Sequence, residues 1–232
     1  MGFLTALGSP LHGLIGGFLV LNLVGRPVEF HCTAPVRPNK AQEILYGATL
    51  ESFVCGEQIA PALVGRTKLN LNAILTNNPN MLTALPLLDV PIGLVLQHVK
   101  TIEPDAETLV QPAMRNVRED DLSTTDSHRS GETAGELAGV TELTNDARQV
   151  GSVFYESLET APVVPGVDYS SLREAVLGKN CIALPVGFTT AAGDKIPFEE
   201  CVARVDPFLK SIDSVEPFER IRLAVEEAQK SC

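Results

Sequence analysis

The sequence has little positive charge. Its 18 lysines and arginines stand against 29 aspartates and glutamates, which gives a formal net charge of −11. No part of the chain gathers basic residues into a cluster. Binding to a phosphate backbone or to an anionic membrane surface requires a basic face. We therefore expect no nucleic-acid partner and no electrostatic attachment to a membrane.

Cysteine is scarce and widely spaced. The five cysteines are an odd number, and no CxxC pair occurs among them. Disulfide frameworks are typical of small, cysteine-dense secreted chains. We therefore expect free thiols, a reducing compartment and a cytoplasmic protein.

The familiar motifs of catalysis and nucleotide binding are missing as well. The sequence contains no GxGxxG, GxxxxGK[ST], HExxH or GxSxG motif and no EF-hand loop. It therefore predicts no common enzyme class, and we expect neither a cofactor nor a metal site.

The chain does have enough apolar residues for a core. Hydrophobic residues make up 44% of the sequence and charged residues 20%, which is ordinary for a globular protein of this length. The composition excludes disorder throughout the chain.

The longest apolar stretch is residues 2–24, which makes a membrane-anchoring helix one alternative. Pro10 and several glycines would interrupt such a helix, and no positively charged segment precedes it. We predict instead a buried strand over Gly17–Asn22, a turn over Leu23–Arg26 and a hairpin partner over Pro27–Cys32.

A long, interrupted helix follows the hairpin. Asn39 is a good N-cap, and Gln42 stands at the position that completes a capping box. Apolar residues then recur at helical spacing as far as Leu63, while Gly47, Gly56 and Pro61 predict kinks or breaks.

Two strands separated by a short helix come next. Residues 69–76 alternate and then become apolar, Asn78 and Pro79 suit the start of a helix, and residues 90–96 are again strand-like. This layout is typical of a crossover unit in a sheet covered by helices. Together with the hairpin it predicts an α/β (α+β) fold with a mixed sheet.

An acidic, apolar-poor stretch divides the chain. Residues 113–148 cannot bury enough surface to offset the entropy of ordering. We expect a flexible linker, or a mobile loop that acts as a lid, between a mixed α/β domain over 1–112 and a smaller α/β part over 149–232.

The smaller part is expected to end in amphipathic helices. We predict the following elements: a helix over Leu172–Leu177 capped by Ser170 and Ser171, a strand over Cys181–Leu184, a helix from Pro197 that breaks at Pro207, and a last helix from Pro217.

Polar residues follow two of the predicted strands. Thr76, Asn77 and Asn78 come after one strand, and Gln97 and His98 after the next. Ligands of open α/β sheets bind beyond the carboxyl ends of the strands. If the two strands are parallel neighbours, these five residues share one rim and are candidates for binding a small molecule.

A second candidate site involves thiols. His31, Cys32 and Cys55 are residue types that serve as nucleophile and base, or as zinc ligands. Adjacent residues of a strand point to opposite faces, so His31 and Cys32 would not both reach one metal. Glu51 and Glu57 do not share a helix face, which argues against a paired-carboxylate site.

The sequence thus favours a non-catalytic, soluble binding or scaffolding module that associates with itself or with a protein partner. A small enzyme that uses the thiols or the polar rim is the first alternative. A protein anchored in the membrane through residues 2–24 is the second.

Overall fold

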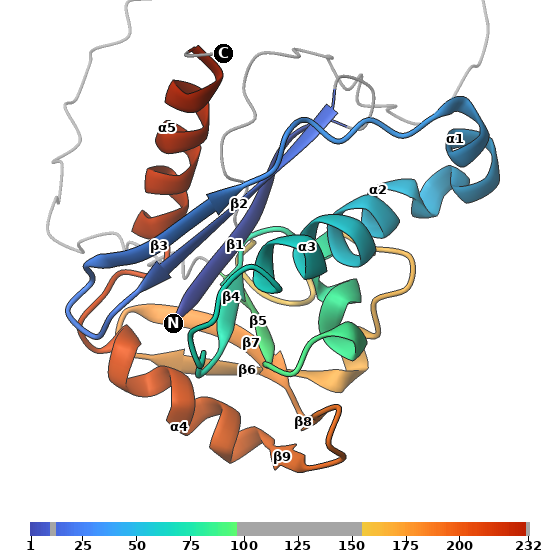
Figure 1. The fold of residues 1–232 in the computed structure, drawn as a ribbon. Helices are drawn as coiled ribbons and strands as arrows, with labels where there is room; N and C mark the ends of the chain where they lie inside the picture. The colour runs from blue at the N-terminus through green and yellow to red at the C-terminus, as the bar shows by residue number, and fades with distance from the viewer. Residues whose placement is uncertain (10–12, 97–154, 231–232) are drawn as a thin grey trace, which may run out of the picture. The chain divides into compact units, whose positions relative to one another are not determined.

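At the centre of the described part of the chain lies a seven-stranded mixed sheet (Figure 1). The computed structural model describes residues 1–9, 13–96 and 155–230, all of which belong to one compact unit. The predicted fold class is confirmed. In sheet order the strands are β3 (Pro27–Cys32), β2 (Gly13–Leu21), β1 (Gly2–Ser9), β4 (Ile74–Thr76), β5 (Ile92–Leu96), β7 (Asn180–Pro185) and β6 (Leu172–Leu177).

The apolar residues at the start of the chain form strands. β1 pairs antiparallel with β2, and β2 pairs antiparallel with β3. The predicted hairpin is confirmed, although its first strand begins at Gly13 and β1 is an additional strand that the sequence analysis missed. An anchoring helix over residues 2–24 does not form, because 2–9 and 13–21 lie in the sheet. Among the described helices, none combines the length and apolar character needed to cross a bilayer.

A broken helical layer covers one face of the sheet. Its elements are α1 (Lys40–Tyr46), η1 (Gly47–Thr49), α2 (Leu50–Ser52), the π-helical turn η2 (Phe53–Ile59) and α3 (Ala60–Val64). The predicted capping box is present, since the side chain of Asn39 accepts from the backbone of Gln42 and the reverse bond also forms. Gly16 of β2 allows the layer to approach, because a Cβ there would lie 2.2 Å from Cγ2 of Ile59.

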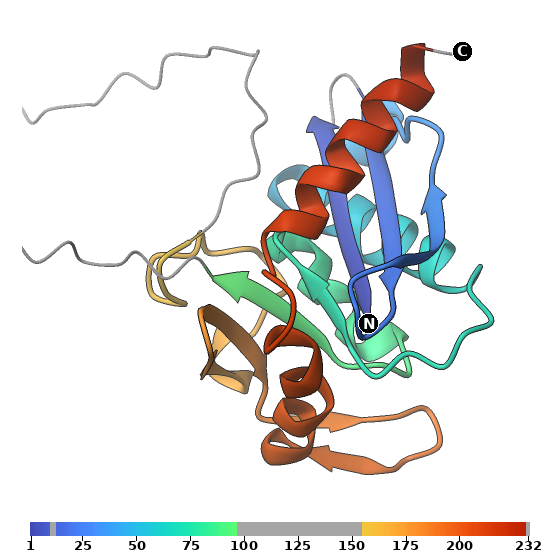
Figure 2. The same ribbon diagram turned by 90° about the vertical axis from the view of Figure 1, so that its left-hand side faces the viewer.

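Two regular helices, α4 (Phe198–Leu209) and α5 (Glu216–Lys230), cover the other face (Figure 2). α5 packs on β1 and β2, where a Cβ on Gly17 would lie 2.2 Å from Cγ2 of Ile221. The predicted break at Pro207 is wrong. Pro207 removes one hydrogen bond near the end of α4, but Phe208 and Leu209 continue the helix because both are buried in the core.

The helix predicted over residues 172–177 is also wrong. This segment is β6, which pairs antiparallel with β7, and Gly178 forms the turn between them with φ of +65°. Asp168 caps the short helix η4 (Tyr169–Ser171) just before the strand. A mixed segment of only six residues fits either a helix or a strand, and pairing with the buried β7 stabilises the strand.

The crossover unit of the central sheet is confirmed. β4 and β5 are parallel neighbours, joined by the 3₁₀-helix η3 (Pro79–Leu87). Asn78 caps η3 as predicted, its side chain accepting from the backbone of Asn80. β4 covers only Ile74–Thr76 of the predicted 69–76, so the chain leaves the sheet immediately after Thr76.

The part of the chain after the acidic stretch continues the same sheet. β7 pairs with β5, and a hairpin of β8 (Gly187–Thr189) and β9 (Lys195–Pro197) follows. The predicted acidic linker over 113–148, and the domain boundaries beside it, lie outside the described residues.

Candidate functional site

The sheet has a switch point between β1 and β4. These strands are parallel, but the chain leaves β1 towards β2 on one side and leaves β4 towards β5 on the other. In open α/β sheets such a point leaves a crevice at the carboxyl ends of the two strands, where ligands bind. Topology therefore directs attention to the residues that follow Leu4 in β1 and Thr76 in β4.

The carboxyl half of β1 has a strand on one side only. Its pairing with β4 ends at Leu4 and Thr76, whereas its pairing with β2 continues to Ser9. From Asn77 onward the chain turns away from β1 into η3. Residues 5–8 therefore border a gap that a longer β4 would have filled.

The hydrogen-bond pattern shows which backbone groups face this gap. Met1 and Leu21 exchange both of their backbone hydrogen bonds. Because antiparallel pairs alternate, the even-numbered residues of β1 direct their N–H and C=O groups away from β2. The amide of Gly2 accordingly donates to Ala73, next to β4. No backbone hydrogen bond joins Ala6 or Gly8 to another described residue on that side.

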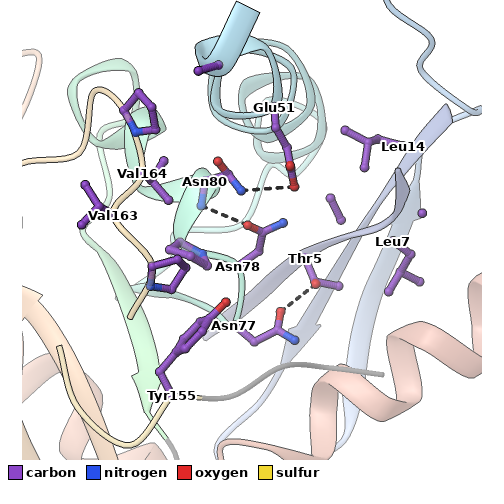
Figure 3. Close-up of a pocket in the computed structure, with 16 residues that line it drawn as sticks. Thr5, Leu7, Leu14, Glu51, Asn77, Asn78, Asn80, Tyr155, Val163 and Val164 are labelled. Atoms are coloured by element: carbon purple, nitrogen blue, oxygen red, sulfur yellow. Dashed lines mark hydrogen bonds between the residues drawn. The ribbon is translucent and has the colours of Figure 1, made fainter. Parts of the chain in front are cut away.

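A cavity of about 420 Å³ occupies the gap (Figure 3). We call it the switch-point pocket. Its walls are residues 5–8 of β1, residues 77–80 after β4, and residues 162–165, together with Glu51 and Tyr155. Its volume lies in the range of small-ligand pockets, roughly 300–1,000 Å³.

A buried polar pair lies in the wall between the two strands. The hydroxyl of Thr5 donates to Oδ1 of Asn77 at 2.6 Å. The exposed fractions of the two residues are 2% and 7%. This bond uses only Oδ1 of Asn77, and no described residue accepts a hydrogen bond from its Nδ2 group. Asn77 thus has a donor in the pocket wall that is available to a ligand.

Three further polar side chains form a connected row at the mouth of the pocket (Figure 3). Oδ1 of Asn78 accepts from the backbone of Asn80 at 3.0 Å, and Nδ2 of Asn80 donates to Oε1 of Glu51 at 3.2 Å. Glu51 is exposed, but the surrounding protein removes part of its hydration and raises its pKa. Among the described lining residues there is no Lys, Arg or His to pair with it.

The remaining wall comes from the far side of the acidic stretch. Tyr155 forms an isolated bridge beside Leu96 of β5, and its side chain lines the pocket. Burial, and secondarily the charge of Glu51, raises the pKa of the Tyr155 hydroxyl, which keeps it a neutral donor and acceptor. Val164 is buried, whereas Val163 is 90% exposed.

The structure brings together part of the predicted rim. Asn77 and Asn78 line the pocket. Thr76 is fully buried, and its hydroxyl accepts from the backbone of Asn78, so it holds the turn rather than facing the cavity. Gln97 and His98 lie outside the described residues.

The residues of the candidate thiol site lie apart. His31 contacts Glu29 on its own strand at 3.2 Å. Cys32 packs against the core under α4 and α5, and Cys55 is buried in the core of the opposite face. Burial raises the pKa of the Cys55 thiol to about 12, with a smaller contribution from Glu51. At neutral pH this thiol is therefore protonated and a poor nucleophile.

Five residues of the pocket were not predicted as site residues: Thr5, Ala6, Gly8, Glu51 and Tyr155. The first three belong to the unpredicted β1, which its apolar pattern over residues 2–7 could have revealed. Glu51 was considered only with Glu57 as a paired-carboxylate site, which their positions on the helix argue against. Tyr155 reaches the pocket through long-range packing, for which the sequence carries no local signal.

The described residues show no cluster of three or more side chains suited to holding a metal ion. No protein-family model, curated protein or solved structure matches this chain. The geometry of the switch-point pocket is therefore the basis on which a function is proposed.

Proposed function

We propose that this protein is a non-catalytic binding module that holds its ligand in the switch-point pocket. The observation that carries the proposal is the switch-point pocket itself, whose wall contains Asn77, a residue that is 7% exposed and whose Nδ2 group donates to no described residue. No buried side-chain nitrogen or oxygen of the described residues lacks a hydrogen-bond partner, so this Nδ2 group is not a buried unpaired donor. A ligand acceptor in the pocket would accept the hydrogen bond that this donor can give.

The chemistry of the walls indicates a polar, uncharged or cationic ligand. Asn77, Asn78 and Asn80 offer amides, Tyr155 offers a neutral hydroxyl, and Glu51 offers a carboxylate. An anionic ligand would meet Glu51 without any basic side chain among the described lining residues to compensate. Neutral hydrogen-bonding groups and cations are the favoured ligand chemistry.

Several observations favour binding over the alternative of a small enzyme. General acid–base catalysis needs positioned groups with suitable pKa values, and the described lining includes one carboxylate. Cys55 is protonated at neutral pH, and His31 is engaged with Glu29. A pocket that recognises a ligand through amides and backbone groups needs none of these.

The test is a nuclear magnetic resonance titration of the full chain with N-methylacetamide, a minimal amide probe. We expect shift changes confined to residues 5–8 and 77–80. The Asn77→Ala variant should lose them, while Asn72→Ala, at an exposed position two residues before β4, should keep them. Changes that are absent, or equal in the two variants, would overturn the proposal.

Self-association and a cytoplasmic location remain part of the proposal. The short helix α1 buries none of its residues, and its Ile44 and Leu45 are 72% and 81% exposed. Such exposed apolar side chains support a protein-contacting surface, and the mass in solution tests it. The four cysteines whose side chains are described are all unpaired, which supports a reducing compartment.

A further inference from the structure

We infer that the ligand of the switch-point pocket is an extended peptide segment, which pairs with the open edge of β1 and places a basic side chain beside Glu51. This inference rests on the proposed function and names its ligand class. Three independent features of the pocket lead to it: its backbone edge, its shape and its charge.

The backbone edge matches the repeat of a peptide strand. Ala6 and Gly8 turn their N–H and C=O groups to the pocket, and they are two residues apart on β1. In a regular strand, groups two residues apart recur at about 6.6–6.8 Å, the spacing at which a neighbouring strand offers its own donors and acceptors. Gly8 keeps its register opposite Leu14, although its φ of +97° is not that of a regular strand. Adding a strand to an exposed edge is a recurring mode of peptide recognition.

The pocket lies where a strand would continue the sheet. β4 stops at Thr76, while β1 extends five residues beyond Leu4, to Ser9, with the edge on the β4 side unpaired. Residues 162–165 form the opposite wall, so the space is bounded on both sides (Figure 3). An added peptide would lie next to residues 5–8 of β1, in the position that β4 would occupy if it continued beyond Thr76.

The polar side chains suit the ends of such a peptide. Nδ2 of Asn77 donates and the hydroxyl of Tyr155 can donate or accept, and neither has a hydrogen-bond partner among the described residues. Peptide carbonyl and amide groups beyond the paired stretch are natural partners for them.

The carboxylate of Glu51 at the mouth of the pocket favours a basic side chain on the bound peptide. Glu51 forms a hydrogen bond with the neutral amide of Asn80 and has no ion pair with a described residue. A lysine or arginine side chain on the bound peptide would supply the missing cation. An acidic side chain there would be repelled.

The experiment measures binding of the blocked pentapeptide acetyl-Thr-Val-Lys-Val-Thr-amide to the full chain by titration calorimetry. Replacing Lys by norleucine in the peptide, or Glu51→Gln in the protein, should weaken binding about threefold to fivefold, as expected for an exposed ion pair. Glu57→Gln, an exposed helix acid outside the pocket, is the matched control and should change nothing.

The backbone contacts are tested from both partners. Ala6→Pro removes an N–H that β2 does not use, so the β1–β2 pairing stays intact, yet affinity should fall about tenfold. N-methylation of the central residues of the peptide should weaken its binding to the unchanged protein by a similar factor. This second measurement keeps the test valid if Ala6→Pro fails to fold.

The outcomes separate this inference from the function on which it rests. If N-methylacetamide maps to the pocket but the pentapeptide binds no more tightly than N-methylacetamide and butylammonium do separately, the ligand is a small molecule and the peptide inference fails. If neither the probe nor the peptide perturbs residues 5–8 and 77–80, the proposed function fails with it.

Discussion

The two halves of β1 have opposite surroundings. Gly2–Leu4 lies between β2 and β4, and its Phe3 and Leu4 are fully buried. Residues 5–8 have β2 on one side and the switch-point pocket on the other. The first half therefore contributes stability, while the second leaves backbone and side-chain groups available for recognition. One strand serves both purposes because β4 is short.

The largest effect is expected in the paired half. Phe3→Ala should lower the free energy of unfolding by about 3–5 kcal/mol, since it removes a buried ring that packs edge-to-face on Phe218. Leu7→Ala in the open half, where the side chain is partly exposed, should cost clearly less. Chemical denaturation measures both, and equal losses would break the distinction between the halves.

β2, which pairs with the open half of β1, should not tolerate a larger side chain at Gly16. A Cβ at Gly16, which pairs with Ala6, would lie 2.2 Å from Ile59 and 2.7 Å from Leu63. Gly16→Ala should therefore destabilise the fold by about 2 kcal/mol. Gly187→Ala is the control, because nothing lies within 4 Å of its Cβ position. A neutral Gly16→Ala would show that the helical layer packs more loosely than the structure indicates.

Within the open half, the buried polar pair is expected to matter moderately. Thr5→Val keeps the shape but leaves Oδ1 of Asn77 without its donor, which should cost about 1–2 kcal/mol in unfolding free energy. Thr49→Val removes an exposed hydroxyl bond and should cost less than about 0.5 kcal/mol. Unfolding curves of the two variants give the comparison, and equal costs would contradict the importance of the buried pair.

The smallest effect concerns Glu51 and has a distinctive pH dependence. Its pKa in the folded protein is raised by loss of hydration, so the folded state holds the proton more tightly than the unfolded state. Stability should therefore fall as the pH rises from the ordinary glutamate pKa through the raised value.

Glu51→Gln should abolish that fall. At neutral pH the variant should be more stable by roughly 0.5 kcal/mol or less, because solvent screens an exposed carboxylate. Below the ordinary glutamate pKa the two proteins should be equally stable. Denaturation across pH measures the difference, and a variant that is less stable at neutral pH would show that Glu51 supports the fold.

The same comparison explains what the sequence could predict. The hairpin of β2 and β3 and the caps at Asn39 and Asn78 follow from local patterns, which act over a few residues. Asn77 and Asn78 could be placed at the site because polar residues at strand ends mark the rim of an open sheet.

The rest of the pocket depends on contacts between distant segments. β1 was missed because the glycines and proline near it resemble helix interruptions in an apolar run, and the tight turn they make was not recognised. Tyr155 lines the pocket beside its bridge to Leu96 of β5, and Val164 lines it from a segment equally distant in the sequence; no pattern near either residue reveals these contacts. Residues 172–177 form β6 rather than the predicted helix because they pair with the neighbouring strand β7 across the turn at Gly178.

Amide hydrogen exchange along β1 tests the central claim most directly. The account predicts slow exchange at Phe3, Leu4, Thr5 and Leu7, fast exchange at Ala6 and Gly8 in the free protein, and slowed exchange at these two amides when the pentapeptide binds. Protection of Ala6 and Gly8 in the free protein, matching that of Leu4, would contradict it, because the edge proposed for recognition would then already be occupied.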